Sequence, residues 1–422
     1  MQLQKPQLFT DTKSFVWAMS ALSMLLLFRL FFSYQEYREF ISKPFYYTYA
    51  DVVSEKSKHS RGKSYKVLKL HAQNGLRFFT TSYRKDSYAN RRLRLQIFPD
   101  EKIGFRGYMG TFFVKSRIKE VLPEQESGYK DTLLAKVAVQ HDSRMLASFY
   151  NAIFFATPLP DTLREQISKL GVSHLIALSG FHLGILWGLI YGLIKIIYAP
   201  LQQRYFPYRF ILIDAGIVTL IVLGIYLWFV GFPPSLVRSY AMLLAGWSLL
   251  VAGMELLSFA FLFTVAGMLL ALFPSLLFSL SFWLSVSGVF AIFLQLKYAQ
   301  AVDRRIQALL IIPVGIFVLM LPVVHGTFGV TTPYQLLSPV LSLLFVPFYP
   351  LVMVLHLVGY GGVFDGALLK LFALPAEAEN HLLPLGVMYG YIVLALLSIR
   401  YRAAFLLLSG AAFSYALYLF LL

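Results

Sequence analysis

The sequence contains no cysteine, and charged residues are scarce. The missing thiols exclude disulfide bonds and cysteine-ligated metal sites, so each folded part depends on packing and hydrogen bonds alone. Only 14% of the 422 residues are charged and 58% are hydrophobic, whereas an ordinary soluble domain is roughly 25% charged. Most of the chain must therefore face lipid or other apolar helices.

Motifs for hydrolytic or nucleotide chemistry are also missing. The eight histidines form no His-x-His and no His-Glu-x-x-His, so neither a metallo-β-lactamase nor a zincin site follows from the sequence. Residues 61–64 are similar to the end of a Walker A loop, but Ser57 stands where that loop needs its first glycine. We therefore expect no catalytic residue, no metal, no cofactor and no enzymatic activity.

The charges that are present gather near the N-terminus. Residues 1–172 hold 27 Lys and Arg against 15 Asp and Glu, whereas residues 173–422 hold 10 against 6. The first part therefore carries a net charge of +12 and the second +4.

Apolar runs of membrane-spanning length fill most of the chain, and they predict an α-helical polytopic membrane bundle of about eleven spans. The first run is long for a signal peptide and lacks a cleavage site, so we expect it to be retained. The eighth and ninth spans contain Pro339, Pro347 and Pro350, so we expect broken helices there. The expected spans are residues 14–33, 174–198, 210–230, 236–254, 257–273, 275–298, 306–324, 334–348, 351–372, 383–399 and 403–422.

Basic residues in the short loops predict the orientation, because cytoplasmic loops are enriched in Lys and Arg. If the spans alternate, these residues share the cytoplasmic side: Lys195, Arg204, Arg209, Lys297, Arg304, Arg305, Arg400 and Arg402. The basic segment after the first span then lies outside, which its length allows, since long domains cross largely regardless of charge.

Between residues 43 and 120 the pattern changes to short runs of β character, namely 45–53, 64–71, 76–82, 91–98 and 104–118. Asn74-Gly75 is a strong hairpin signal. Five short strands suit a small β-barrel such as the OB-fold. The expected organisation is a first span at 1–36, a basic OB-like domain at 40–122, amphipathic helices at 128–172 and a membrane bundle at 173–422.

The OB-like segment has the composition of a nucleic-acid-binding surface. It holds 18 basic and 6 acidic residues, interleaved with tyrosines and phenylalanines, as in OB-folds that bind single strands. In the fourth strand Leu93, Leu95 and Ile97 alternate with polar residues, which predicts an arginine-bearing outer face. The alternative is a basic domain resting on anionic lipid. The DNA-binding candidates are Arg77, Arg84, Lys85, Arg91, Arg92, Arg94, Lys115 and Arg117.

Polar residues and glycines interrupt an apolar run between His174 and Gly184. Ionisable groups within a span are costly and are functional candidates by default. On one continuous helix Ser179 and His182 would share a face. Three readings stay open: lining of a conduit, helix packing through the small residues, and a Ser-His nucleophilic pair without a nearby carboxylate. The conduit candidates are His174, Ser179, Gly180, His182, Arg238 and His325.

The segment His174-Leu-Ile-Ala-Leu-Ser-Gly-Phe-His-Leu-Gly184 resembles a signature of ComEC-type competence proteins, which are DNA-uptake channels of the bacterial inner membrane. Residues 233–242, 279–285 and 325–350 resemble later blocks of that family in the same order. Gly288 and Ser342 depart from the family pattern, where alanine and asparagine are common. The chain is similar to the short form, without the C-terminal metallo-hydrolase domain of longer members.

The resemblance implies that one DNA strand passes through the bundle to the cytoplasm. It also implies a periplasmic DNA receptor on one side and a cytoplasmic motor or single-strand-binding protein on the other, with membrane lipids around the bundle. Two rival functions stay open: a membrane enzyme acting on a lipid-linked substrate through Ser179 and His182, and a small-solute transporter. The enzyme would rest its basic domain on anionic headgroups, but the sequence lacks paired carboxylates at a membrane boundary. The transporter would not need the strongly basic outer domain.

Overall fold

The computed structural model describes residues 8–9, 11–60, 63–84, 86–88, 91–124, 128–176, 178–255, 258–374 and 377–421. It divides into two compact units, each considered by itself below. The N-terminal unit comprises residues 12–132 and 266–280, and the helical unit comprises residues 1–11, 133–265 and 281–422.

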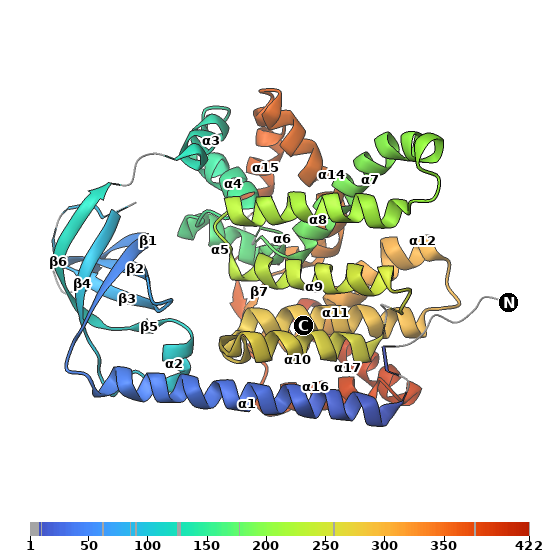
Figure 1. Ribbon diagram of the computed structural model, residues 1–422, viewed down its shortest axis with the longest axis horizontal. Coiled ribbons are helices and arrows are strands. Elements are labelled where there is room, and N and C mark those ends of the chain that lie inside the picture. The colour runs from blue at the N-terminus through green and yellow to red at the C-terminus, as the bar shows by residue number, and fades with distance from the viewer. Residues whose placement is uncertain are drawn as a thin grey trace. The chain divides into compact units, whose positions relative to one another are not determined.

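The first part of the chain forms one apolar helix followed by a six-stranded sheet (Figure 1). Its elements are α1 (Thr12–Ser42), β1 (Tyr46–Ser60), β2 (Lys63–Ala72), β3 (Arg77–Ser82), β4 (Arg91–Phe98), α2 (Phe105–Met109), β5 (Phe112–Phe113) and β6 (Lys115–Glu124).

The sheet has the order β5-β3-β2-β1-β4-β6, antiparallel except for the parallel pair β3 and β5. Leu93, Leu95 and Ile97 of β4 are fully buried, which confirms the predicted alternation. They pack with residues of β1, β2 and β3 and with Phe40 of α1. The hairpin predicted at Asn74-Gly75 is present, with Gly75 at φ +83°, a conformation that favours glycine.

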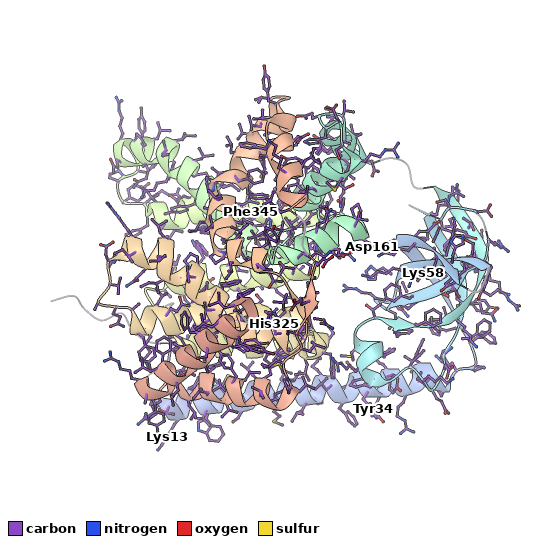
Figure 2. The ribbon with its side chains drawn as sticks, turned by 180° about the vertical axis from the view of Figure 1, so that it is seen from behind. Lys13, Tyr34, Lys58, Asp161, His325 and Phe345 are labelled. Atoms are coloured by element: carbon purple, nitrogen blue, oxygen red, sulfur yellow. The ribbon has the colours of Figure 1, made fainter. Side chains whose placement is uncertain are left out.

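Two expectations for this region are wrong in detail. The fifth predicted strand, 104–118, begins instead with the short helix α2, because Phe105 and Tyr108 turn their rings toward Tyr37 of α1. The first strand is longer than predicted and ends at Ser60. Beyond Asp51 the β1 partners belong to β2 alone, so the two strands form an arm that carries Lys58 (Figure 2).

The rest of the chain is almost entirely helical. Its elements are α3 (Tyr129–Ala138), α4 (Arg144–Phe155), α5 (Asp161–Lys169), α6 (Ser173–Ile176), α7 (Gly180–Tyr205), α8 (Ile211–Phe229), α9 (Pro234–Val251), α10 (Phe259–Leu272), η1 (Pro274–Phe278), α11 (Leu280–Tyr298), α12 (Arg304–Ile306), η2 (Gln307–Ile311), α13 (Ile312–His325), β7 (Val330–Thr331), η3 (Pro333–Leu337), α14 (Ser338–Leu357), η4 (Gly361–Phe364), α15 (Asp365–Phe372), β8 (Glu379–Asn380), α16 (Leu385–Leu397) and α17 (Arg402–Leu421).

Within the described residues, seven helical stretches are long and apolar enough to cross a membrane, and three shorter apolar helices accompany them. The protein is therefore a multi-pass membrane protein. The predicted break near Pro347 and Pro350 is wrong, because α14 runs through both prolines. Its buried residues Phe345, Tyr349 and Val352 pack in the helical core, which holds the helix together despite the missing donors. The predicted span at 351–372 is also wrong, since α15 has only 8 residues.

The N-terminal sheet depends on its single buried face. Replacing Leu95 with alanine removes a fully buried side chain, and such a change costs about 2–5 kcal/mol. We expect the free energy of unfolding of this sheet to fall by that amount, measured by urea-dependent proteolysis of the full chain in detergent. Gln96→Ala, on the opposite face of the same strand, is the matched control. Equal decreases for both variants would contradict the one-sided core.

Candidate functional site

The segment with the polar motif does not form one continuous helix. Helix α6 ends at Ile176 and α7 begins at Gly180, with Ser179 as its N-cap. The Ser179 Oγ accepts from the Phe181 N–H at 3.3 Å, and the Ser179 N–H donates to His182 Nδ1 at 3.3 Å. The predicted contact between Ser179 and His182 is therefore present, but it arises from reciprocal capping instead of a shared helix face.

The imidazole of His182 lies at the centre of this region and is 0% exposed. Because Nδ1 accepts from the Ser179 N–H, the neutral ring carries its proton on Nε2. Among the described residues, Nε2 has no hydrogen-bond partner. The ring packs edge-on against Phe345 and Tyr349, with centroids 5.1 and 4.9 Å away. His182 therefore offers one buried donor that its own capping role does not use.

Helix α14 brings a distant part of the sequence against the motif. His174 Nε2 lies 3.2 Å from Ser342 Oγ, although the two residues are 168 positions apart. Ser338 Oγ donates to the Gly171 carbonyl at 3.1 Å, and Thr332 Oγ1 donates to the Lys169 carbonyl at 2.6 Å. These bonds join residues 325–350 to the motif and to the residues just before it. The order of the blocks along the sequence did not reveal these contacts. Figure 2 labels Phe345 within this unit.

Helix α9 supplies the third part. Ser235 Oγ donates to the Leu178 carbonyl at 2.6 Å. A Cβ atom on Gly180 would lie 2.8 Å from Ser239 Oγ, so glycine is what permits this close approach of α7 and α9. We call the assembly of Ser179, His182, His174, Ser342 and Arg238 the polar cluster.

Arg238 connects the polar cluster to α11. Its guanidinium donates to Ser281 Oγ at 2.8 Å and lies 6.0 Å from the ring centre of Phe282. Only 7% of the residue is exposed, so it does not reach a solvated interface as a snorkelling arginine would. Contacts thus link four blocks of the sequence, namely 174–184, 233–242, 281–285 and 325–350.

His325 differs from the other conduit candidates. Its Nδ1 lies 3.0 Å from the Leu321 carbonyl and its Nε2 lies 3.0 Å from Thr331 Oγ1. Both ring nitrogens are therefore engaged within its own segment (Figure 2). The geometry gives His325 a role in fixing the turn after α13.

A second buried group, His141, His356 and Asp365, was missed from the sequence. His141 Nδ1 lies 2.9 Å from Asp365 Oδ2, and His141 Nε2 lies 3.0 Å from His356 Nε2. The signal available was weak: each residue stands near the end of a helical stretch, and more than 200 positions separate His141 from its partners. Across the described ranges, no three His, Cys, Asp or Glu side chains are placed to hold a metal ion.

The outer face of the N-terminal sheet carries basic side chains next to aromatic rings. Cross-strand partners place Tyr47 beside Gln96, and Gln96 beside Arg117. Tyr47 is 50% exposed, and the Arg94 guanidinium lies 6.0 Å from its ring centre. Lys69 lies similarly over Phe79, at 6.0 Å. Alternating rings and cations of this kind suit stacking on bases and contact with phosphates.

The predicted DNA-binding residues divide by their partners. Arg92 is held by Asp51 through two bonds of 2.7 and 3.0 Å, and these bonds raise the pKa of Arg92. Arg94 lies 3.8 Å from Glu120. Arg91 is half-buried, and Lys85 lies outside the described residues. The exposed candidates, besides Arg94, are Arg77, Arg84, Lys115 and Arg117.

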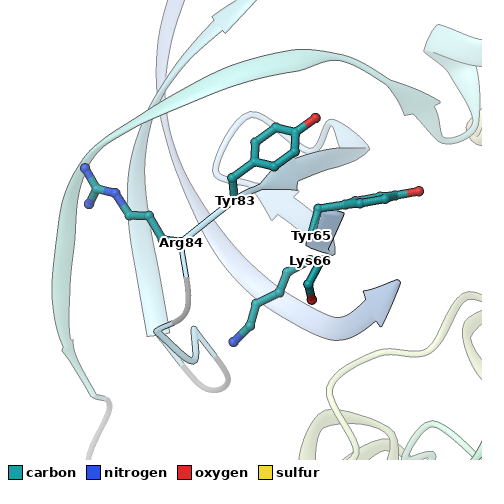
Figure 3. Close-up of a pocket in the computed structure, with 5 residues that line it drawn as sticks. Tyr65, Lys66, Tyr83 and Arg84 are labelled. Carbon is teal, nitrogen blue, oxygen red and sulfur yellow. The ribbon is translucent and has the colours of Figure 1, made fainter. Parts of the chain in front are cut away.

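A cavity of about 420 Å³ opens beside the β1–β2 arm and is lined by Ser64, Tyr65, Lys66, Tyr83 and Arg84 (Figure 3). The rings of Tyr65 and Tyr83 are 6.1 Å apart and tilted by 45°. The Lys66 ammonium is committed to Glu55 at 2.5 Å and to the Asp86 carbonyl at 2.8 Å. Burial raises the pKa of Glu55, but hydrogen bonds from Lys66 and the Tyr88 N–H lower it more, so the pKa stays below its usual value. Glu55 is therefore a carboxylate near neutral pH and holds the Lys66 ammonium, so Arg84 is the cation left to meet a ligand.

Comparison with known proteins gives one match. No curated protein and no solved structure is similar to the chain at a significant level. A protein-family model described as "Competence protein" matches residues 156–383, which is more than half of the 422 residues. The matched range contains the whole polar cluster and all four blocks that compose it. The chain therefore belongs to the Competence protein family.

Proposed function

We propose that this protein is a channel that passes single-stranded DNA across the bacterial cytoplasmic membrane during natural transformation. Membership of the family suggests a role in DNA uptake. The observation that carries the proposal is the polar cluster, in which hydrogen bonds link four separate sequence blocks of an apolar helical unit and in which His182 and Arg238 are buried. Buried polar groups in lipid-embedded proteins are expensive and commonly line a substrate path.

The rival, an enzyme acting on a lipid-linked substrate, is less well supported by the geometry. In a Ser-His pair the second histidine nitrogen is usually oriented by a third group. Here Ser179 Oγ lies 3.3 Å from His182 Nδ1, but Nε2 has no hydrogen-bond partner among the described residues, so no carboxylate orients the ring. We therefore favour a non-enzymatic role.

We further propose that the N-terminal sheet closes into an OB-like barrel. Residues 112–124 supply both edge strands, β5 beside β3 and β6 beside β4. Thr80 Oγ1 of β3 also lies 2.7 Å from Ser116 Oγ of β6. Closure of this kind removes the exposed edges that an open sheet would present.

The barrel would lie on the outer, periplasmic face of the membrane and collect DNA there. The basic loops of the helical unit support a cytoplasmic position for Arg204 and Arg304. A periplasmic receptor would deliver the DNA, and a cytoplasmic motor or single-strand-binding protein would draw it in. Membrane lipids would surround the apolar helices, since many of their large side chains are exposed.

Two exposed arginines on the outer sheet face test the electrostatic part of this proposal. Arg77 and Arg117 have no ion pair with any described carboxylate. The double variant Arg77→Gln, Arg117→Gln should bind single-stranded DNA more weakly in fluorescence anisotropy. Its salt slope should fall by about 0.7 for each phosphate that the variant no longer neutralises. The double variant Arg304→Gln, Arg305→Gln, in α12 of the helical unit, is the charge-matched control, and an equal effect there would contradict the assigned face.

The tyrosine-lined cavity tests whether the domain selects single strands. Tyr83 is 71% exposed, and stacking on one base contributes about 1–3 kcal/mol. Tyr83→Ala should therefore weaken single-strand binding by roughly tenfold and duplex binding little, while Tyr83→Phe keeps the affinity. Tyr208→Ala removes a ring that is 76% exposed elsewhere and should have no effect. If Tyr83→Ala weakened binding to duplexes, or to vesicles of anionic lipid, as much as binding to single strands, the result would favour a domain that rests on lipid headgroups.

DNA entry into cells tests the channel itself. A strain without the protein should accumulate labelled DNA outside the cytoplasmic membrane, and the protein should restore entry. Ser179→Ala removes only an N-cap, which contributes roughly 0.5–2 kcal/mol, so entry should fall by less than about thirtyfold. Ser179→Trp should block entry while leaving DNA bound outside.

The amount of each variant in the membrane is measured by immunoblot. A nucleophile would give the reverse result, since removal of a catalytic serine costs on the order of 10⁶-fold. Abolition of entry by Ser179→Ala in a correctly inserted protein would support the enzyme.

A further inference from the structure

The group of His141, His356 and Asp365 joins three separate elements of the helical unit. His141 lies in the connection between α3 and α4, His356 in the last turn of α14, and Asp365 at the start of α15. Helices α4, α14 and α15 gather in the same part of Figure 1 and share one hydrophobic core. We call these three side chains the His-His-Asp cluster.

The cluster is tightly enclosed. The His141 side chain is 0% exposed, and its ring stacks on Tyr150 with centroids 4.5 Å apart. A Cβ atom on Gly361 would lie 2.6 Å from His356 Nε2, so the glycine lets the chain pass directly over the imidazole. The Asp365 side chain is 20% exposed and gives the cluster its access to water.

Gln140 closes the cluster from the side. Its Nε2 donates to the His356 carbonyl at 3.1 Å, and its Oε1 accepts from the Gly361 N–H at 2.8 Å. The α3–α4 connection is therefore bonded to the α14–α15 turn at two adjacent residues, Gln140 and His141.

The hydrogen bonds of the cluster require three protons. His356 Nδ1 faces the Val352 carbonyl at 2.6 Å, and a carbonyl can only accept, so this nitrogen holds one proton. One proton must lie between His141 Nε2 and His356 Nε2, and another between His141 Nδ1 and the Asp365 carboxylate. Two neutral imidazoles and a carboxylate hold only two protons. The observed geometry thus corresponds to a cluster with one additional proton and no net charge.

We propose that the His-His-Asp cluster is a proton-binding site whose bound proton holds the α3–α4 connection against the α14–α15 turn. When that proton leaves, two lone pairs face each other across a separation of about 3 Å, and a buried acceptor is left without its donor. The site goes beyond DNA conduction and does not depend on it. Because the closed state binds the additional proton, raising the pH favours opening.

The other groups around the cluster do not supply this proton. Tyr150 faces both imidazoles from α4, and burial, followed by the charge of Asp365, raises its pKa well above the usual value. Tyr150 therefore stays neutral over the range in which histidine titrates. Gln140 carries no charge, so the additional proton lies among the two histidines and Asp365.

Opening would first affect the start of α4. This helix contributes Leu146, Tyr150 and Ile153 to the main core of the helical unit. The same stretch continues through α5 into Gly171, which α14 contacts through Ser338. Release of the cluster would thus loosen the support of the segment that leads into the motif.

Because the sequence contains no cysteine, a single introduced cysteine can be labelled selectively in the full chain, which allows a direct test. Ala147, in the first turn of α4, is 8% exposed and Val139 is 86% exposed. Single cysteines at Ala147→Cys and Val139→Cys are each labelled with a maleimide in detergent. The ratio of the two rates is compared with the same ratio in Asp365→Asn, which corrects for the ordinary effect of pH on a buried thiol. Between about pH 6 and 9 this ratio should rise by at least about tenfold.

Asp365→Asn is the decisive variant. Its carboxamide can donate to His141 Nδ1, so all three bonds form with two neutral imidazoles and no additional proton. The labelling ratio should then stay low across the pH range, whereas Asp365→Ala should label rapidly throughout. The same pH dependence in Asp365→Asn as in the unmodified cluster would overturn the proposal. A flat profile in the unmodified cluster would overturn it too, without reference to any variant.

Discussion

A polar group inside an apolar helical unit needs a hydrogen-bond partner, because water is excluded there. Burying an unpaired donor or acceptor costs on the order of several kcal/mol of free energy. This constraint explains most of the arrangement around the motif. Ser179 caps α7, and Ser235 of α9 donates to the Leu178 carbonyl in the break between α6 and α7. Ser338 of α14 donates to the Gly171 carbonyl just before α6. The breaks on either side of α6 therefore leave carbonyls that α9 and α14 satisfy.

The same constraint separates the polar residues by role. His325 is satisfied at both nitrogens, and Arg238 is bonded to Ser281 from a nearly buried position. Of the two motif histidines, His182 has a buried ring nitrogen, Nε2, without a hydrogen-bond partner among the described residues. An unsatisfied buried group in a native protein calls for an explanation, which makes His182 the residue of the motif to examine first.

Sequence reasoning reached the features that depend on local pattern. The alternation around Leu93 predicted the buried face of β4, and Asn74-Gly75 predicted the hairpin, because both follow from strand geometry within a few residues. Helix α2 and the continuity of α14 were missed, since Tyr37 and the core around Tyr349 decide them from distant parts of the chain. For the site, the Ser179–His182 contact was accessible at a spacing of three residues. The contact of His174 with Ser342 and the whole His-His-Asp cluster were not, because each depends on pairs more than 160 positions apart.

The close approach at Gly180 changes which substitutions are informative about a conduit. Any side chain there would meet Ser239 of α9 at once, so a bulky residue would force the two helices apart before it could narrow a path. A failure of DNA entry after such a change would report helix packing, which agrees with the small-residue reading of the motif at this position. Ser179 is different: its side chain is half-buried at the helix start, and its cap can be removed at modest cost. A bulky residue at Ser179 therefore separates obstruction from unfolding, provided that the variant reaches the membrane in normal amounts.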